Sequence, residues 1–187
     1  MYQAQDFTHL IGTPGMSESL LKNHFTLYEG YVKNTNTLIE LKKTTEPGTP
    51  QFAELERRFG WEWNGMRLHE LYFGNMKSGG SALSDGVLKA KIIEQYGSFD
   101  AFMKHFIGVG TMRGIGWVVL SYDKTKDALA VSWVNEHDVG HLVGTTPLLI
   151  MDVFEHAFML DYGLKRADYI NAFVAAIDWS VVEKRLG

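Results

Sequence analysis

The sequence predicts an α+β protein in which an N-terminal antiparallel helical hairpin precedes a C-terminal domain with a small three-stranded antiparallel sheet and helices. Apolar residues keep a helical spacing as far as Met76, whereas short runs rich in Val, Leu and Trp fall in the second half. Between them, Lys77 to Gly86 concentrates Gly and Ser without periodicity. We therefore place a domain boundary there, with a helical hairpin domain at 1–80 and a C-terminal α/β domain at 81–187.

Two long helices are expected to form the hairpin. Ser17 is a suitable N-cap for a helix that runs to Lys43, because its hydroxyl can accept a hydrogen bond from a free N–H of the first turn. After the TTEPGTP break, Thr49 followed by Pro50 is typical of a helix start, and helical spacing then continues to Met76. Two long helices in succession predict an antiparallel pair.

Shorter elements are expected after the boundary. A helix should follow Gly86 and end at Gly97, and Ser98 should cap a second helix, SFDAFMKHF, which the Gly-rich GVGTMRGIG segment terminates. Trp117 to Tyr122 and Ala128 to Val134 are rich in Val, Leu, Trp and Tyr and flank the polar DKTKD. This pattern predicts a β-hairpin.

The last third of the chain should complete the sheet and cover it. Pro147 to Met151 is a further apolar run that predicts a third strand, with Asp152 at its end. From Val153 the residues favour a helix until Gly163, and ADYINAFVAAIDW then predicts an amphipathic helix.

Composition excludes several classes of function. The 187 residues are 45% hydrophobic and 21% charged, as in ordinary globular domains, and the net charge of -4 with a pI near 6.0 argues against a general affinity for nucleic acid. No apolar run is long enough to span a membrane, and the N-terminus has no basic region followed by an apolar one, so a cytoplasmic protein is expected. Because the chain has no cysteine, any metal site must use His and carboxylates.

Several histidines are candidate ligands, but their spacing alone does not decide the matter. Asp152 and His156 are four residues apart across the predicted strand-to-helix junction, which suits a shared metal but also an ordinary pair on a helix surface. His24 and His69 stand in apolar surroundings. Periodicity alone favours core histidines that bond to backbone carbonyls.

Longer motifs provide a clearer indication. The segment PLLIMDVFEHAFMLDYGLKRADY, from Pro147 to Tyr169, resembles the signature of the iron/manganese superoxide dismutases, in which Asp-x-Trp-Glu-His-Ala is followed by an aromatic pair, Asp-Tyr and a basic run. GYVKNTNTLIE from Gly30, HELYF from His69 and GIGW ending at Trp117 resemble further segments of that family in the same order. The resemblance covers essentially the whole chain.

The resemblance implies a mononuclear metal site and its chemistry. The family's ligand positions fall on His24, His69, Asp152 and His156. One iron or manganese ion per subunit is implied, with a slight preference for iron, and superoxide is the implied substrate of an antioxidant dismutation to dioxygen and hydrogen peroxide. Three neutral imidazoles, one carboxylate and a bound hydroxide would leave a trivalent ion at net +1, and reduction coupled to protonation of the hydroxide would preserve that charge.

Two further residues are implied as catalytic groups. Tyr31 matches the family's gateway tyrosine, although it follows His24 by seven residues where the family usually has eight. His137 matches a position, fifteen residues before Asp152, from which a side chain donates to metal-bound solvent. The family's alternative donor position holds Gly65 here, and a surface turn is the competing interpretation of His137.

The resemblance also implies an assembly and a substrate funnel. Arg166 matches an arginine that would draw superoxide toward the site, and Glu155 should accept a hydrogen bond from the ligand histidine of a second subunit. A homodimer is therefore expected and a tetramer stays open, while no nucleic-acid or membrane partner is expected. Tyr28 and Met159 depart from the family pattern at positions that normally meet across this interface. The residues expected to wall the pocket are Tyr72, Phe73, Trp117 and Phe154.

Two alternatives stay open at this stage. A different mononuclear non-haem iron oxidoreductase could use two His and one carboxylate, although the extra His and the order of motifs argue against it. A non-catalytic, metal-binding descendant of the dismutases is the second alternative, because Tyr28, Met159 and the shortened helix spacing depart from the family.

Overall fold

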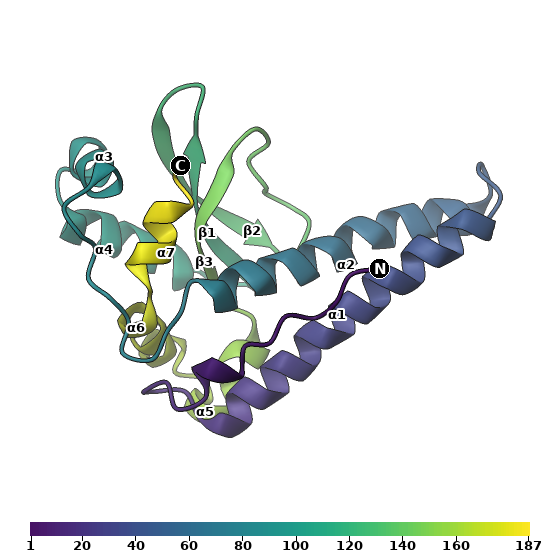
Figure 1. Ribbon diagram of the computed structural model, residues 1–187, viewed down its shortest axis with the longest axis horizontal. Helices are drawn as coiled ribbons and strands as arrows, with labels where there is room; N and C mark the ends of the chain where they lie inside the picture. The colour runs from purple at the N-terminus through teal and green to yellow at the C-terminus, as the bar shows by residue number, and fades with distance from the viewer.

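The computed structural model of the protein covers residues 1–187 and confirms the α+β order. A long helical hairpin is followed by a sheet and shorter helices (Figure 1). The domain boundary after residue 80 remains a prediction. The elements are α1 (Glu18–Thr44), α2 (Pro50–Gly74), α3 (Val87–Tyr96), α4 (Phe99–Gly110), β1 (Gly116–Asp123), β2 (Ala128–Asn135), β3 (Thr146–Asp152), α5 (Met159–Tyr162), α6 (Arg166–Ala176) and α7 (Trp179–Lys184), with 3-10 turns at Thr8–Leu10 and Glu155–Ala157.

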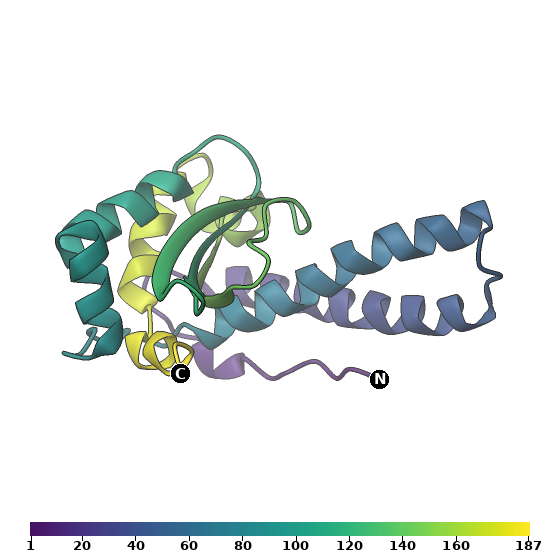
Figure 2. The ribbon, with the colours of Figure 1, turned by 90° about the horizontal axis from the view of Figure 1, so that it is seen from above.

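Both hairpin helices begin at side-chain caps. The Ser17 hydroxyl accepts a hydrogen bond from the Leu20 N–H at 3.0 Å, and the Thr49 hydroxyl accepts one from the Phe52 N–H at 3.2 Å. The hairpin extends away from the sheet, with its connecting loop at the far tip (Figures 1 and 2). The end of α2 therefore lies against β3, and the start of α1 lies beside the 3-10 turn that follows β3 (Figure 1).

The sheet fixes the end of β3 against the start of β1. Its strand order is β2-β1-β3 with both pairings antiparallel, and residues 116–121 of the central strand are buried. Trp117 pairs with Asp152 in the β1–β3 register. In both ribbon views the sheet lies between the hairpin and the α3–α4 pair (Figures 1 and 2). Asp152 is thus the last residue of a strand whose neighbour is α2.

The chain after β3 does not form the continuous helix predicted from Val153 to Gly163. Asp152 Oδ1 accepts a hydrogen bond from the Phe154 N–H at 2.8 Å, and Phe154 is extended. A 3-10 turn and the short α5 follow instead. This side-chain hydrogen bond turns the backbone before a helix can begin. As a result, His156, the residue after Glu155, points back toward Asp152.

Local contacts, and not helix propensity, determine where α4 and α6 end. α4 continues through the glycines of GVG to Gly110, where a Cβ atom would press on the end of the flexible Met151 side chain. The predicted single helix ADYINAFVAAIDW is broken, because Ile177 is extended and its carbonyl accepts the Ser81 N–H at 2.8 Å. The Asp178 carboxylate then caps α7.

An N-terminal segment that the sequence did not predict lies along the hairpin. Phe7 is buried against Tyr28 and Phe73, with ring centroids 5.7 and 5.0 Å away. The Gln5 N–H donates to the Tyr28 hydroxyl at 3.0 Å. The segment thereby covers aromatic side chains that lie behind two of the candidate histidines.

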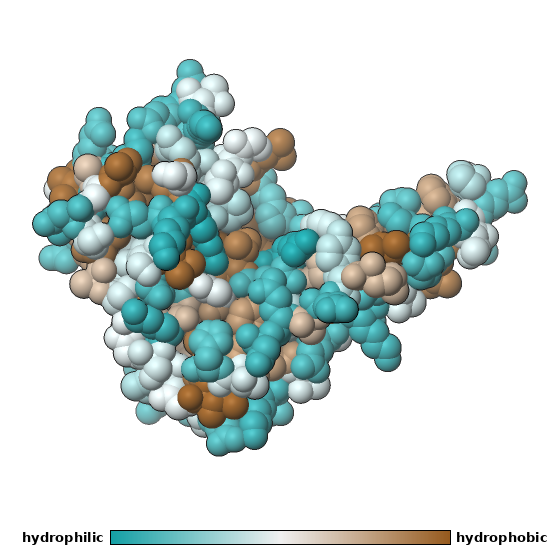
Figure 3. All heavy atoms as spheres, viewed as in Figure 1, coloured by the Kyte–Doolittle hydropathy of each residue, from teal (hydrophilic) through white to brown (hydrophobic).

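The surface is mainly hydrophilic on the face shown in Figure 3, with small hydrophobic patches, one of them over α5 at the lower edge. Met159 and Leu160 of α5 are among the exposed large hydrophobic residues. None of the helices combines the length and the apolar character needed to cross a membrane.

Gly65 allows the two hairpin helices to approach at Tyr31. A Cβ atom built on Gly65 would lie 2.6 and 2.7 Å from two carbons of the Tyr31 ring, whereas one built on Gly60 in the same helix would meet nothing within 4 Å. The aromatic ring of α1 therefore occupies the space that a side chain on α2 would need.

This difference predicts opposite outcomes for two alanine substitutions in α2. Gly60→Ala should stabilise the protein by up to about 1 kcal/mol, because alanine has the higher helix propensity. Gly65→Ala should instead destabilise it by about 1–3 kcal/mol, because the Tyr31 ring must move. Urea denaturation of both variants checks the prediction. Equal stabilisation by the two alanines would contradict the packing described here.

Candidate metal centre

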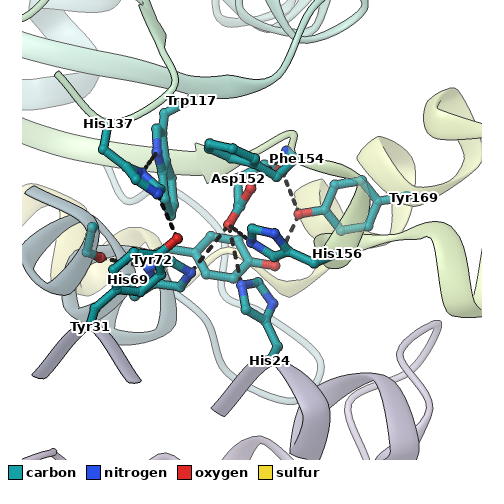
Figure 4. A network of polar contacts seen from close by, with 11 residues as sticks. His24, Tyr31, His69, Tyr72, Trp117, His137, Asp152, Phe154, His156 and Tyr169 are labelled. Carbon is teal, nitrogen blue, oxygen red and sulfur yellow. Dashed lines mark hydrogen bonds and ion pairs between the residues drawn. The ribbon is translucent and has the colours of Figure 1, made fainter. Parts of the chain in front are cut away.

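Four side chains from both halves of the chain converge at one point (Figure 4). His24 comes from α1, His69 from α2, Asp152 from the end of β3 and His156 from the 3-10 turn that follows. One nitrogen or oxygen atom of each lies within 4.8 Å of those of the other three. The residues that the motifs singled out are therefore the ones that the fold brings together.

The Asp152 carboxylate is at the centre of this group. Its Oδ2 lies 3.1 Å from His156 Nε2, 3.2 Å from His24 Nε2 and 3.7 Å from His69 Nε2. Its Oδ1 accepts the Phe154 N–H, which fixes the plane of the carboxylate. Asp152, His24 and His69 are buried, and the His156 side chain is 28% exposed.

The hydrogen bonds of His69 indicate that the group is built for a cation. Its Nδ1 lies 2.6 Å from the Gly65 carbonyl oxygen, which can only accept, so Nδ1 carries the proton. Nε2 then presents a lone pair and has no hydrogen-bond partner in the chain, although it is buried. It faces Asp152 Oδ2, a second acceptor. A metal ion between them would satisfy both atoms.

The protonation states also suit a metal. Burial by itself raises the pKa of Asp152, but His156 and His24 outweigh it and hold that pKa well below its usual range. Burial lowers the pKa of His24, and burial together with His24 lowers that of His69. An ionised Asp152 carboxylate beside the neutral imidazoles of His24 and His69 is the state in which these groups bind metals.

Two buried tyrosines hold Asp152 from behind. The Tyr169 hydroxyl donates to the Asp152 carbonyl at 2.7 Å and lies 3.0 Å from the Tyr72 hydroxyl. Burial raises the pKa of both phenols, so both remain protonated donors. The main chain that carries the carboxylate is therefore tied to α2 and α6.

The predicted wall residues all contact ligand rings. Tyr72 and Phe73 lie with ring centroids 5.4 and 4.9 Å from that of His24. Trp117 meets His69 edge-on at 4.9 Å, and Phe154 stacks on His156 at 5.0 Å. The packed aromatic rings bury the imidazoles of His24 and His69 and restrict their rotation. The wall residues are Tyr72, Phe73, Trp117 and Phe154.

His137 and Tyr31 form a hydrogen-bonded pair beside the ligands. Trp117 Nε1–H donates to His137 Nδ1 at 3.0 Å, and His137 Nε2 lies 2.8 Å from the Tyr31 hydroxyl oxygen. Because an indole N–H can only donate, Nδ1 must accept, so the proton of neutral His137 is on Nε2 and is donated to Tyr31. Burial lowers the pKa of His137 to about 4, which favours this neutral form. Burial, reinforced by Asp152, raises the pKa of Tyr31.

The shortened spacing between His24 and Tyr31 still directs both side chains to the site. α1 is an uninterrupted α-helix, and seven residues at about 100° each bring Tyr31 to within about 20° of the direction of His24. Its ring stacks on His69 at 5.1 Å. The missing residue therefore does not turn Tyr31 away from the ligands.

Three other residues of interest lie outside the four-ligand group. Both guanidinium arms of Arg166 donate at 2.7 Å to the carbonyls of Met112 and Gly114, and no contact joins Arg166 to the ligands. Glu155 is exposed beside His156. The Tyr28 hydroxyl accepts from the N-terminal segment and donates to Glu70 at 3.1 Å, and burial raises its pKa to about 12.

Sequence reasoning missed the role of Tyr169 and the proximity of Trp61. Tyr169 stood at the end of the quoted motif, and that position is the only signal that could have singled it out. Trp61 packs against His137 and Tyr31, with ring centroids 4.4 and 5.7 Å away. Nothing in its spacing from His69 indicated this, because the contact depends on how the turn after β2 lies on α2.

Several known proteins are similar to this chain over most of its length. Residues 84–185 match the family described as iron/manganese superoxide dismutases, C-terminal domain. An iron superoxide dismutase of Sulfolobus acidocaldarius is 35% identical over 184 residues, covering 92% of this chain and 86% of that protein. One of Cupriavidus metallidurans is 37% identical over 172 residues, covering 88% and 85%. A manganese superoxide dismutase of Haloferax volcanii is 35% identical over 171 residues, covering 89% and 84%. With this similarity along most of its length, the chain belongs to the iron/manganese superoxide dismutase family.

Proposed function

We propose that the protein is a superoxide dismutase that holds one iron or manganese ion through His24, His69, Asp152 and His156. The observation that carries the proposal is the buried, ionised Asp152 carboxylate facing the unpartnered Nε2 of His69. Relatives named for iron and for manganese both match the chain. The ligand set can accept either metal. We retain the slight preference for iron that accompanies the sequence resemblance.

In the net reaction two superoxide ions and two protons give one dioxygen and one hydrogen peroxide. When bound, the ion supplies the one-electron redox chemistry. The chain's own residues hold the ion, exclude bulk water and supply protons. His137 donates to the Tyr31 oxygen, so the Tyr31 hydroxyl proton is free to point into the pocket. Because the pKa of Tyr31 is raised, its hydroxyl stays protonated until a stronger base in the pocket accepts the proton.

Two alternatives fit the site less well. A non-haem iron oxygenase would use two His and one carboxylate, whereas three histidines surround Asp152 here. A non-catalytic descendant was suggested by Tyr28 and Met159. The Tyr28 hydroxyl is hydrogen-bonded to the Gln5 N–H and to Glu70, and to none of the four candidate ligands, so this departure from the family pattern leaves the ligand set intact.

We also propose a homodimer. His156 directs Nε2 at Asp152, whereas its Nδ1 has no hydrogen-bond partner in the chain. The His156 side chain is partly exposed, so a second copy can reach Nδ1. Glu155 of a second copy could accept that Nδ1–H, and the exposed Met159 and Leu160 would be buried beside it. Arg166 would contribute positive charge near this face without leaving its carbonyl partners. A tetramer, a cytoplasmic location and an antioxidant role remain predictions from the sequence.

The enzyme proposal is tested by loading the metal-free protein separately with iron and with manganese. Bound metal near one ion per chain and rapid superoxide decay in at least one form are expected, because the ligands and the donor pair are both in place. Stoichiometric metal without turnover in either form would leave the non-catalytic descendant as the better account. Light scattering of the same samples should give the mass of two chains or a multiple of it, and a monomer would contradict the dimer.

His137→Ala should separate metal binding from turnover. The variant keeps all four ligands, so its metal content should match that of the wild type. Turnover should fall about 10–100-fold, because Tyr31 loses its hydrogen-bond donor. Metal analysis and stopped-flow measurement of superoxide decay check both parts. A variant with normal metal content and a normal rate would remove His137 from the mechanism.

A further inference from the structure

His137 is held on four sides, and three of the contacts come from residues already placed at the site. Trp117 donates to Nδ1, Tyr31 bonds to Nε2 and Phe154 stacks on the imidazole at 4.8 Å. The fourth contact is the indole of Trp61, whose centroid is 4.4 Å away and closer than that of any other ring. His137 is fully buried and Trp61 is only partly so, which places the indole on the outer side of His137.

Trp61 is itself fixed in orientation. Its Nε1–H donates to Glu136 Oε2 at 3.3 Å. The Arg58 guanidinium lies over the indole, 4.2 Å from the ring centroid, and its Nε donates to the buried Glu62 at 2.7 Å. A cation held over one face and a hydrogen bond at the edge together restrict rotation of the indole.

Glu136 directly precedes His137 and has an unfavourable backbone conformation. Its φ is +50°, a region that residues other than glycine, asparagine and aspartate rarely adopt. Its N–H donates to the Ile115 carbonyl at 3.2 Å. Such a conformation persists only where surrounding contacts hold it. The bond from Trp61 is the one side-chain hydrogen bond that joins Glu136 to α2.

We propose that Trp61 and Glu136 form a clamp that positions His137 toward Tyr31. The clamp joins α2, which carries the ligand His69, to the turn after β2, which carries His137. Neither residue contacts the four ligands through a hydrogen bond, so both act through the orientation of the imidazole. The kinetic part of this inference rests on the proposed dismutase function, and the structural part does not.

The test follows the Nε2–H proton of His137 by NMR in the full chain loaded with zinc, a diamagnetic ion that takes His and carboxylate ligands. Trp61→Phe keeps a ring but removes the N–H donor, and Glu136→Ala removes the acceptor. Each should speed exchange of that proton with water about tenfold and lower the kcat of the iron-loaded protein about tenfold with little change in KM. Glu136→Gln, which retains an acceptor oxygen, should restore most of both.

Trp63→Phe is the matched control. Trp63 lies one residue beyond Glu62 on the same helix, but it packs against Tyr2 and Arg67 and not against His137. It should leave exchange and kcat unchanged, and the Trp61→Phe, Glu136→Ala double variant should be no worse than either single one.

Wild-type exchange in both single variants, additive losses in the double variant, or an equal loss in Trp63→Phe would overturn the clamp. Faster exchange in the clamp variants of a protein that shows no dismutation at all would uphold the clamp while removing the proposed function. Normal dismutation by the wild type, with proton exchange and kcat unchanged in the clamp variants, would uphold the proposed function and remove the clamp.

Discussion

A carboxylate that stays ionised while fully buried must be matched by nearby positive charge or donors, because desolvation costs several kcal/mol. Asp152 is in that position, and the structure around it follows from this need. The Phe154 N–H fixes one of its oxygens, and three imidazoles surround the other. The Tyr169 hydroxyl fixes the backbone that carries it. Since His69 presents a lone pair, the group is fully satisfied only around a cation.

The two halves of the chain meet where this charge lies. The hairpin contributes two histidines from rigid helices, and the sheet contributes the carboxylate through the register that pairs Trp117 with Asp152. Gly65 serves both the orientation of a candidate ligand and the packing of the hairpin. Its carbonyl sets the tautomer of His69, and its lack of a side chain leaves room for the Tyr31 ring. Packing of the hairpin and the chemistry of the ligands are therefore the same constraint at this residue.

Much of the fold could be predicted from the sequence, because helix caps and strand composition are local signals, whereas only the resemblance of longer motifs indicated the four candidate ligands. The short turn after β3 could not, because the bond from Asp152 to the Phe154 N–H overrides helical propensity. Nor could the break at Ile177, which depends on pairing with Ser81 far along the chain. The shortened spacing between His24 and Tyr31 is visible in the sequence. Its effect on the direction of the Tyr31 side chain became clear only from the geometry of the uninterrupted helix α1. The roles of His137, Arg166 and Glu155 remain predictions.

Metal-dependent stabilisation of Asp152→Asn tests the central claim most directly. Asparagine keeps the size of the side chain and an acceptor for the Phe154 N–H but removes the charge. Free metal at about 100 times the dissociation constant should stabilise the wild type by about 2.7 kcal/mol in denaturant unfolding, because the ion binds only the folded state. The same metal concentration should leave the variant almost unchanged. Equal stabilisation of both proteins would show that the ion binds elsewhere and that the buried charge of Asp152 does not define the site.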